Sequence, residues 1–155
     1  MDLNLLDVET LAEQGSKMPV LHPVTGEQLF NEPEKKNGEP KYWNIYLKGT
    51  GSKSFKKKFS EAVDEMAAKQ ARQRQAERAG KKAKIDDIEI KPFDVRISEL
   101  CDELADLTVS WEGITEGGVE LQFSKSEAAR LYLKYEWLRN QAKAFVDDAA
   151  NFIKA

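Results

Sequence analysis

Residues 42–47 read Tyr-Trp-Asn-Ile-Tyr-Leu, and this stretch is the strongest strand signal in the chain. Aromatic and β-branched residues favour extended structure, and in a strand every second side chain lies on the same face. One face carries Trp43, Ile45 and Leu47. The other face carries Tyr42, Asn44, Tyr46 and Lys48. We therefore expect a strand here, with its more apolar face directed to the core.

Shorter elements are expected before this strand. Gly15 follows an amphipathic pattern and is expected to end a short helix that carries Leu3, Leu6, Val8 and Leu11. Pro23 and Gly26 favour a tight turn between residues 20–21 and 28–30, which predicts a small hairpin. Residues 31–41 are rich in Pro, Glu, Lys, Asn and Gly, so a loop is expected there.

A long helix is expected after the strand. Ser52 or Ser54 can cap its first turn, and helix-favouring residues continue to about Ala79. An apolar stripe at helical spacing consists of Phe55, Phe59, Val63 and Met66. The stripe then stops, because residues 69–84 offer no apolar side chain larger than alanine. We expect this second half to be helical, exposed and mobile.

Three helices and a hairpin are expected in the C-terminal half. Pro92 favours the start of a core helix whose apolar face carries Phe93, Ile97, Leu100, Leu104 and Leu107. Gly117 and Gly118 separate two short apolar runs, 111–114 and 119–123, and predict a hairpin. Ser124 and Glu127 match a capping box before a helix over 125–135. A last helix is expected to run to the C-terminus, with a seam of Leu138, Ala142, Phe145, Ala149 and Phe152.

These patterns predict an α+β fold. We expect a helix-dominated single domain with a small N-terminal antiparallel β-sheet and an exposed basic helix, because 155 residues are enough for one core. Residues 1–52 are expected to form the N-terminal helix and β-sheet, and residues 53–84 the long basic helix. Residues 85–155 are expected to form a helical C-terminal part with a short hairpin.

The charge of the chain changes at the same boundaries. The formal net charge of -3 divides into -3 for residues 1–52, +7 for residues 53–84 and -7 for residues 85–155. The basic segment could bind nucleic acid, dock on an acidic surface of its own chain or of a partner, or stay solvated. Phe55 and Phe59 precede the basic tract and do not alternate with it, which disfavours a stacking platform for single-stranded nucleic acid.

Residue types that carry catalysis or bind metals are sparse. Cys101 is the only cysteine and His22 the only histidine, so the chain can form neither a zinc site nor a cysteine nucleophile with its base. The glycines before Lys53 do not have the spacing of a phosphate-binding loop. We expect no enzyme activity, no metal and no cofactor. A single cysteine, no signal sequence and no apolar run of membrane-spanning length predict a cytoplasmic protein.

A family resemblance is carried mainly by the C-terminal part. Its pattern consists of Trp111, Glu112, Gly113, Phe123, Ser124, Glu127, Ala128, Tyr135, Trp137, Leu138, Gln141, Phe145, Asp148, Asn151 and Phe152. A less specific likeness in the N-terminal part consists of Pro23, Thr25, Gly26, Ile45, Leu47, Gly49 and Ser52. In pattern and order the chain resembles the tail assembly chaperones of long-tailed, siphophage-like bacteriophages, which are encoded just ahead of the tape measure protein.

The resemblance implies a role in viral tail assembly in the host cell cytoplasm. Such a chaperone binds the tape measure protein, keeps it soluble, recruits tail tube protein and is absent from the mature virion. Further partners that the resemblance implies are other copies of the chain, as a homo-oligomer, and a frameshift-extended form. Nucleic acid and membranes are not expected partners.

Two groups of residues are candidate partner sites. A tape measure protein exposes long apolar helical stripes that require shielding, which leads to the hypothesis of a groove bordered by Trp111, Trp137, Leu138, Phe145 and Phe152. For each tryptophan taken alone, a place in the core is the more common role and a partner contact the less common one. The second group is expected to attract acidic surfaces and consists of Lys69, Arg72, Arg74, Arg78, Lys81 and Lys82. The alternatives that stay open are a nucleic-acid-binding phage accessory or regulatory protein that uses residues 53–84, and a small structural tail component.

Overall fold

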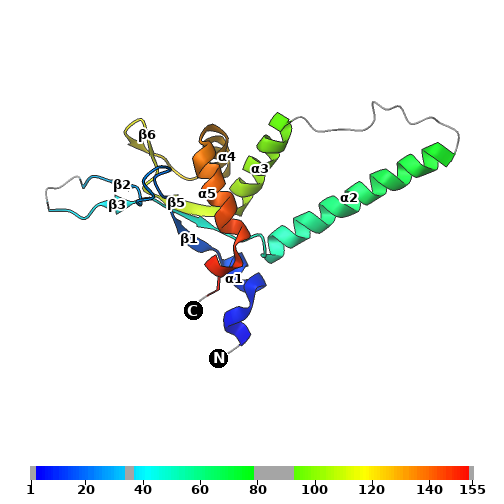
Figure 1. The fold of residues 1–155 in the computed structure, drawn as a ribbon, viewed down its shortest axis with the longest axis horizontal. Helices are drawn as coiled ribbons and strands as arrows, with labels where there is room; N and C mark the ends of the chain where they lie inside the picture. Colours follow the sequence, from blue (N-terminus) through cyan, green and yellow to red (C-terminus); the bar gives the residue numbers. More distant parts are fainter. Residues whose placement is uncertain (1–2, 34–36, 79–92, 154–155) are drawn as a thin grey trace.

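A three-stranded antiparallel sheet combines strands from the N-terminal and C-terminal parts of the chain. The computed structural model of the protein describes residues 3–33, 37–78 and 93–153. β4 (Asn44–Leu47) lies in the middle of this sheet, between β1 (Ser16–Pro19) and β5 (Thr108–Glu112) (Figure 1). The strand expected at residues 42–47 is therefore confirmed over residues 44–47, at the centre of the fold, whereas Tyr42 belongs to a separate short hairpin. The partner strand β1 was not predicted, and residues 111–112 of β5 were expected to pair in a hairpin around Gly117 and not with this strand.

Two short hairpins extend from this sheet. β2 (Phe30–Asn31) pairs with β3 (Lys41–Tyr42), so the first and last residues of the loop expected at 31–41 are paired with each other as strand residues. β6 (Thr115–Glu116) pairs with β7 (Val119–Glu120). Gly117 and Gly118 have φ angles of 62° and 79° at this turn, as the sequence pattern predicts. The hairpin expected around Gly26 is reduced to a single bridge between Leu21 and Gln28.

The helices follow the predicted order, with two differences: the expected opening helix is divided at Asp7 into two short helices, and the last helix ends before the C-terminus. In chain order they are η1 (Leu3–Leu6), α1 (Val8–Gln14), α2 (Lys53–Arg78), α3 (Phe93–Leu107), α4 (Lys125–Lys134), α5 (Glu136–Asp147) and η3 (Ala149–Asn151). The prediction of one last helix running to the C-terminus is wrong. Asp148 breaks it, because this residue is extended and its side chain accepts a hydrogen bond from the Ala150 amide, which starts η3.

The core lies between the sheet and the C-terminal helices. Ile45 and Leu47 are fully buried in it. The remaining buried members of this cluster are Met18, Val20, Cys101, Leu104, Ala105, Leu107, Ile114, Ala128, Leu131, Tyr132, Leu138, Ala142 and Val146. Thr108 donates to the Leu104 carbonyl at 2.8 Å and hydrogen bonds with the Tyr132 hydroxyl at 2.8 Å. Burial raises the pKa of Tyr132 to about 12, so this hydroxyl keeps its proton.

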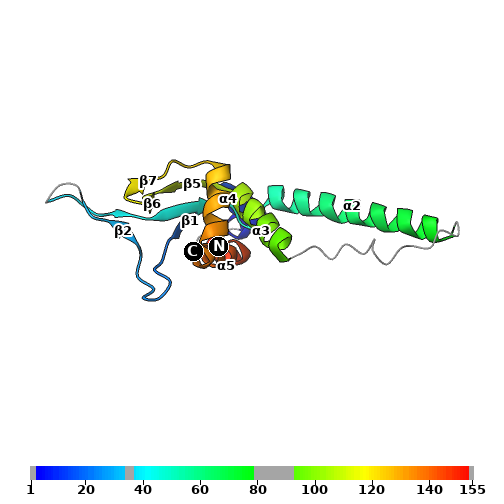
Figure 2. The same ribbon diagram turned by 90° about the horizontal axis from the view of Figure 1, so that it is seen from above.

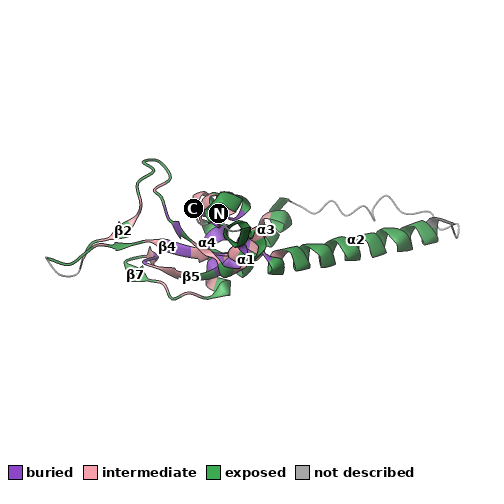
Figure 3. Cartoon of the chain, turned by 90° about the horizontal axis from the view of Figure 1, so that it is seen from below, coloured by how far each residue is buried: buried purple, intermediate pink, exposed green. Residues whose placement is uncertain are grey.

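One helix stands apart from this body. α2 leaves the end of the sheet and projects away from α3, α4 and α5 (Figures 1 and 2). Its side chains are exposed from Lys56 to Ala76, which Figure 3 shows along the helix. The α+β, helix-dominated fold with an exposed basic helix is thus confirmed, although the sheet also takes β5 from the C-terminal half. Pro92 and residues 79–84 of the expected elements lie outside the described residues.

Candidate partner-binding surface

The first turn of α2 is fixed to the body of the protein. Ser52 is fully buried, and its Oγ accepts a hydrogen bond from the Phe55 amide at 3.3 Å, which caps the helix. Glu13, in α1, accepts hydrogen bonds from the Ser54 amide and from Lys48 Nζ, both at 3.0 Å. The Ser54 hydroxyl also donates to this carboxylate at 2.5 Å, and the hydrogen bonds from the Ser54 hydroxyl, the Ser54 amide and Lys48 together lower the pKa of Glu13 to about 2. The direction in which α2 leaves the body is therefore set by its N-terminal turn.

The apolar stripe of α2 is largely uncovered. Phe55 is half-buried, and its ring stacks on that of Phe59 with a centroid distance of 6.5 Å. Phe59 and Met66 have exposed fractions of 63% and 62%, and Val63 is also exposed. Since α2 is amphipathic only in this first half, its apolar side chains lie next to the body and not at the distal end.

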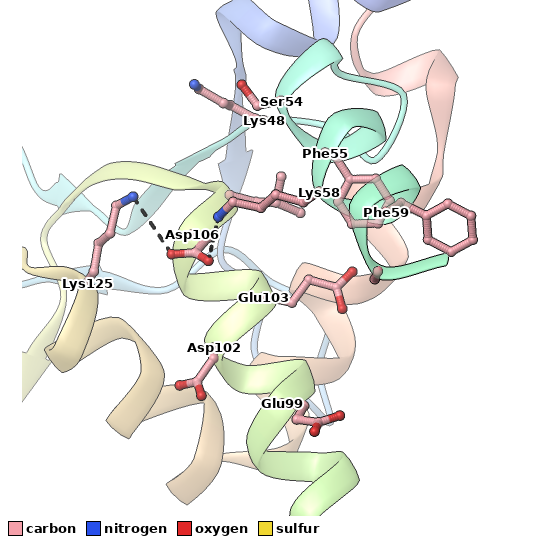
Figure 4. A pocket seen from close by; sticks show the side chains of 12 residues that line it. Lys48, Ser54, Phe55, Lys58, Phe59, Glu99, Asp102, Glu103, Asp106 and Lys125 are labelled. Atoms are coloured by element: carbon pink, nitrogen blue, oxygen red, sulfur yellow. Dashed lines mark hydrogen bonds and ion pairs between the residues drawn. The ribbon is translucent and has the colours of Figure 1, made fainter. Parts of the chain in front are cut away.

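A groove of about 520 Å³ separates this part of α2 from α3. Phe55, Phe59 and Ala62 line it from α2, and four carboxylates line it from α3: Glu99, Asp102, Glu103 and Asp106. Figure 4 shows these two walls facing each other, with Lys58 and Lys125 at the end nearest the sheet. The groove thus has an apolar wall and an acidic wall.

Only part of the acidic wall is neutralised. Asp106 forms ion pairs with Lys58 at 2.8 Å and with Lys125 at 3.8 Å. Asp102 and Glu103 form no ion pair within the parts of the chain that the structure describes. The groove therefore presents net negative charge next to apolar surface.

The seam expected to bind a partner is mostly internal. Leu138 and Phe152 have exposed fractions of only 4% and 3%. Phe145 is half-buried, and its ring packs edge-on against Phe152 at 5.5 Å. An added Cβ at Gly49 would lie 2.8 Å from the Phe152 ring, which shows how closely the β4–α2 connection packs there. Leu138 and Phe152 therefore leave little surface for a partner.

The two candidate tryptophans lie in different places and make different contacts. Trp111 packs edge-on against Phe123 at 5.1 Å, and its Nε1 donates to the Leu121 carbonyl at 2.9 Å. Trp137 and Leu138 border a small cavity of about 120 Å³ beneath the β6–β7 hairpin. Of the five candidate residues, only Trp137 and Leu138 border this cavity, and none of the five lines the α2–α3 groove.

The basic candidates lie on the distal half of α2. Lys69, Arg72 and Arg74 are exposed and form no ion pair with other described residues. Arg78 is the last residue of α2, and Lys81 and Lys82 lie outside the described residues. This distribution places the solvated cations far from the sheet (Figure 1).

The surroundings of Cys101 and His22 fit structural roles for both side chains. Burial raises the pKa of the Cys101 thiol, which disfavours the reactive thiolate. His22 Nδ1 accepts hydrogen bonds from the Val24 and Thr25 amides at 3.1 Å each, which stabilises the turn. Within the described residues, no group of three or more His, Cys, Asp or Glu side chains could hold a metal ion.

Sequence reasoning missed the α2–α3 groove as a site. The apolar stripe on α2 was predicted, but it was not connected with the carboxylates of α3. Their spacing at residues 99, 102, 103 and 106 places them along one face of a helix, and this periodicity was the available signal. The fold is needed to bring that face opposite Phe55 and Phe59.

Fold and surface together define a small α+β protein with an open groove beside an exposed helix. Comparison of the chain with protein-family models, with curated proteins and with solved structures finds no match. Among the helices in the described part of the chain, none has both the length and the apolar character that crossing a bilayer requires.

Proposed function

We propose that this protein is a non-enzymatic tail assembly chaperone of a long-tailed bacteriophage. It binds helical segments of the tape measure protein in the host cytoplasm, keeps that protein soluble and recruits tail tube subunits around it. The proposal combines the family resemblance of residues 111–152 with one structural observation. That observation is the exposed apolar stripe of α2, with Phe59 and Met66, which continues the apolar wall of the α2–α3 groove.

The size of the apolar stripe suits a helical partner. From Phe55 to Met66 the stripe covers about three turns, or roughly 17 Å of helix axis. A partner helix lying along it would contribute residues at i, i+3, i+4 and i+7, which is the usual pattern of helix-in-groove recognition. Shielding a tape measure protein then requires many copies of the chaperone along its length, because each copy covers only a few turns.

The test is co-expression with the long helical protein encoded immediately downstream. We expect that protein to be insoluble alone, and to become soluble and co-purify with the wild-type chain. The double variant Phe59→Ser/Met66→Ser should lose this effect, because it removes the apolar stripe. A matched control, Val24→Ser/Val119→Ser, removes two exposed apolar side chains outside the groove and should behave like wild type.

Two results would contradict the proposal. If the Phe59→Ser/Met66→Ser variant solubilises the downstream protein as well as wild type does, the apolar stripe of α2 and the groove wall that it continues are not the binding site. If even the wild-type chain fails to solubilise that protein, the chaperone function itself is wrong.

A nucleic-acid-binding accessory protein is the second candidate. The observation in its favour is the row of Lys69, Arg72 and Arg74 on the solvent-exposed half of α2. Phosphate contacts of this kind give an affinity that falls steeply as salt concentration rises. Retention of DNA at low salt, together with failure to solubilise the downstream protein, would establish this function in place of the chaperone.

A further inference from the structure

The α2–α3 groove offers two different surfaces to one occupant. Phe55, Phe59 and Ala62 present apolar surface from α2. Asp102 and Glu103 line the groove from α3 and carry negative charge. In Figure 4, Glu103 extends towards Phe59, and Asp102 lies on the side of α3 nearer α4. An occupant that contacts both walls must therefore carry apolar and cationic groups on adjacent sides.

The charge on the α3 wall is unbalanced in the free protein. Lys58 and Lys125 both pair with Asp106, and Lys48 pairs with Glu13 at 3.0 Å, so the basic residues that line the groove already have partners. Asp102 and Glu103 are adjacent in the sequence, and neither has a cationic partner among the described residues, so these two like charges repel each other. Cations supplied by a bound partner would offset this repulsion.

We infer that the groove selects amphipathic helices whose apolar stripe is edged on one side by lysine or arginine. This inference rests on the proposed function and defines the class of tape measure segment that the site takes. The apolar stripe of such a helix lies against Phe55 and Phe59, and its basic edge lies against Asp102 and Glu103. A polyanion does not fit this position, because the acidic wall repels phosphates.

The test uses three synthetic helical peptides of about three heptads each. All three carry leucine at the a and d positions, and they differ only at the e position, which is lysine, glutamine or glutamate. Binding of each peptide to the full-length chain is measured by fluorescence anisotropy at low and at high salt. We expect the lysine peptide to bind about tenfold more tightly than the glutamine peptide at low salt, and the glutamate peptide to bind most weakly.

Variants of the acidic wall make the test specific. Asp102→Asn/Glu103→Gln should abolish most of the preference for the lysine peptide, and it should raise the melting temperature of the free chain by relieving repulsion. Asp64→Asn/Glu65→Gln is a matched control, because it removes the same charge from α2 at positions that do not line the groove. That control should retain the full preference.

The possible outcomes separate this inference from the proposed function. Equal binding of the lysine and glutamine peptides, or an unchanged preference in the Asp102/Glu103 variant, overturns the inference even if the downstream protein still co-purifies. A peptide-free dimer that buries the groove also overturns it, since a second copy would then be the occupant. If no peptide binds and co-expression with the downstream protein also fails, the inference and the proposed function fall together.

Discussion

Glu13 connects three elements through one carboxylate. It lies in α1 and accepts hydrogen bonds from Lys48, which follows β4, and from Ser54 in the first turn of α2. A carboxylate near a helix N-terminus is also favoured by the helix dipole. The ion pairs Lys56–Glu9 and Lys58–Asp106 and the packing of Phe55 also hold α2 to the body. Glu13 differs from these contacts because it bonds both the first turn of α2 and the residue after β4, and so it contributes to the orientation of α2 and to the shape of the groove.

Replacement of Glu13 by glutamine should destabilise the protein in a pH-dependent way. The folded pKa of about 2 lies below the ordinary value of 4.5, so the carboxylate stabilises the fold above about pH 4.5. This contribution is lost as the pH falls from about 4.5 towards 2. At neutral pH we expect a loss of about 1 kcal/mol, since the side chain remains partly exposed. Thermal unfolding of both proteins between pH 7 and pH 2 measures it.

The control for this prediction is Glu9→Gln. Glu9 also joins α1 to α2, through an exposed ion pair with Lys56 at 3.2 Å, and such pairs contribute little. Its replacement should cost less than that of Glu13. A difference between wild type and Glu13→Gln that stays constant from pH 7 to pH 2 would show that the carboxylate charge is not the cause.

At the scale of elements, periodicity in the sequence identifies an apolar face but not what covers it. The stripe of α2 and the seam of α5 have similar spacings, yet Phe59 is exposed whereas Leu138 is buried. Their environments differ because α5 packs against α3 and α4, and α2 leaves the sheet in another direction. Periodicity therefore predicts both elements correctly, but it does not reveal that the stripe of α2 is exposed whereas Leu138 in α5 is buried.

Local signals were sufficient for the elements that were predicted well. Ser124 Oγ accepts a hydrogen bond from the Glu127 amide at 3.1 Å, which is the serine half of the predicted capping box, and α4 begins at the next residue. The Glu127 carboxylate pairs with Arg130 instead of the Ser124 amide. The pairing of β1 and β5 with β4 was missed because contacts over long sequence distances, and not their own composition, make them strands of this sheet. The groove was missed for the same reason, since α2 and α3 meet there only in the folded chain.

Two phenylalanines allow a direct comparison of core and surface. Phe152→Ala should cost about 3–5 kcal/mol of unfolding free energy, because it leaves a cavity beside Phe145 and Gly49. Phe59→Ala should change the unfolding free energy by no more than about 0.5 kcal/mol, because that ring is exposed. Urea unfolding midpoints measure both. A loss at Phe59 that equals the loss at Phe152 would mean that α2 is part of the core and not a binding surface.

For the whole molecule, the main feature is the separation of charge. The distal half of α2 carries Lys69, Arg72 and Arg74 into solvent, whereas the α3 wall of the groove is acidic (Figures 1 and 4). Charges on an extended arm act over about a Debye length, so they increase the rate of encounter with an acidic partner. On the function proposed above, the groove determines how long an apolar helix stays bound. The two regions should therefore affect different rate constants.

The variant Lys69→Glu/Arg72→Glu/Arg74→Glu separates these contributions. We expect the distal half of α2 to attract acidic surfaces of tail tube protein. The rate constant for association with that protein should therefore fall by about tenfold at low salt and differ little from wild type at high salt. The dissociation rate constant of a tape measure segment bound in the groove should stay nearly unchanged, because none of the three side chains lines the groove. Phe59→Ser should show the opposite pattern, with faster dissociation and similar association. Surface plasmon resonance at several salt concentrations measures both rate constants. If association of the wild-type chain does not depend on salt, the basic distal half of α2 does not steer the encounter, and the groove alone accounts for recognition.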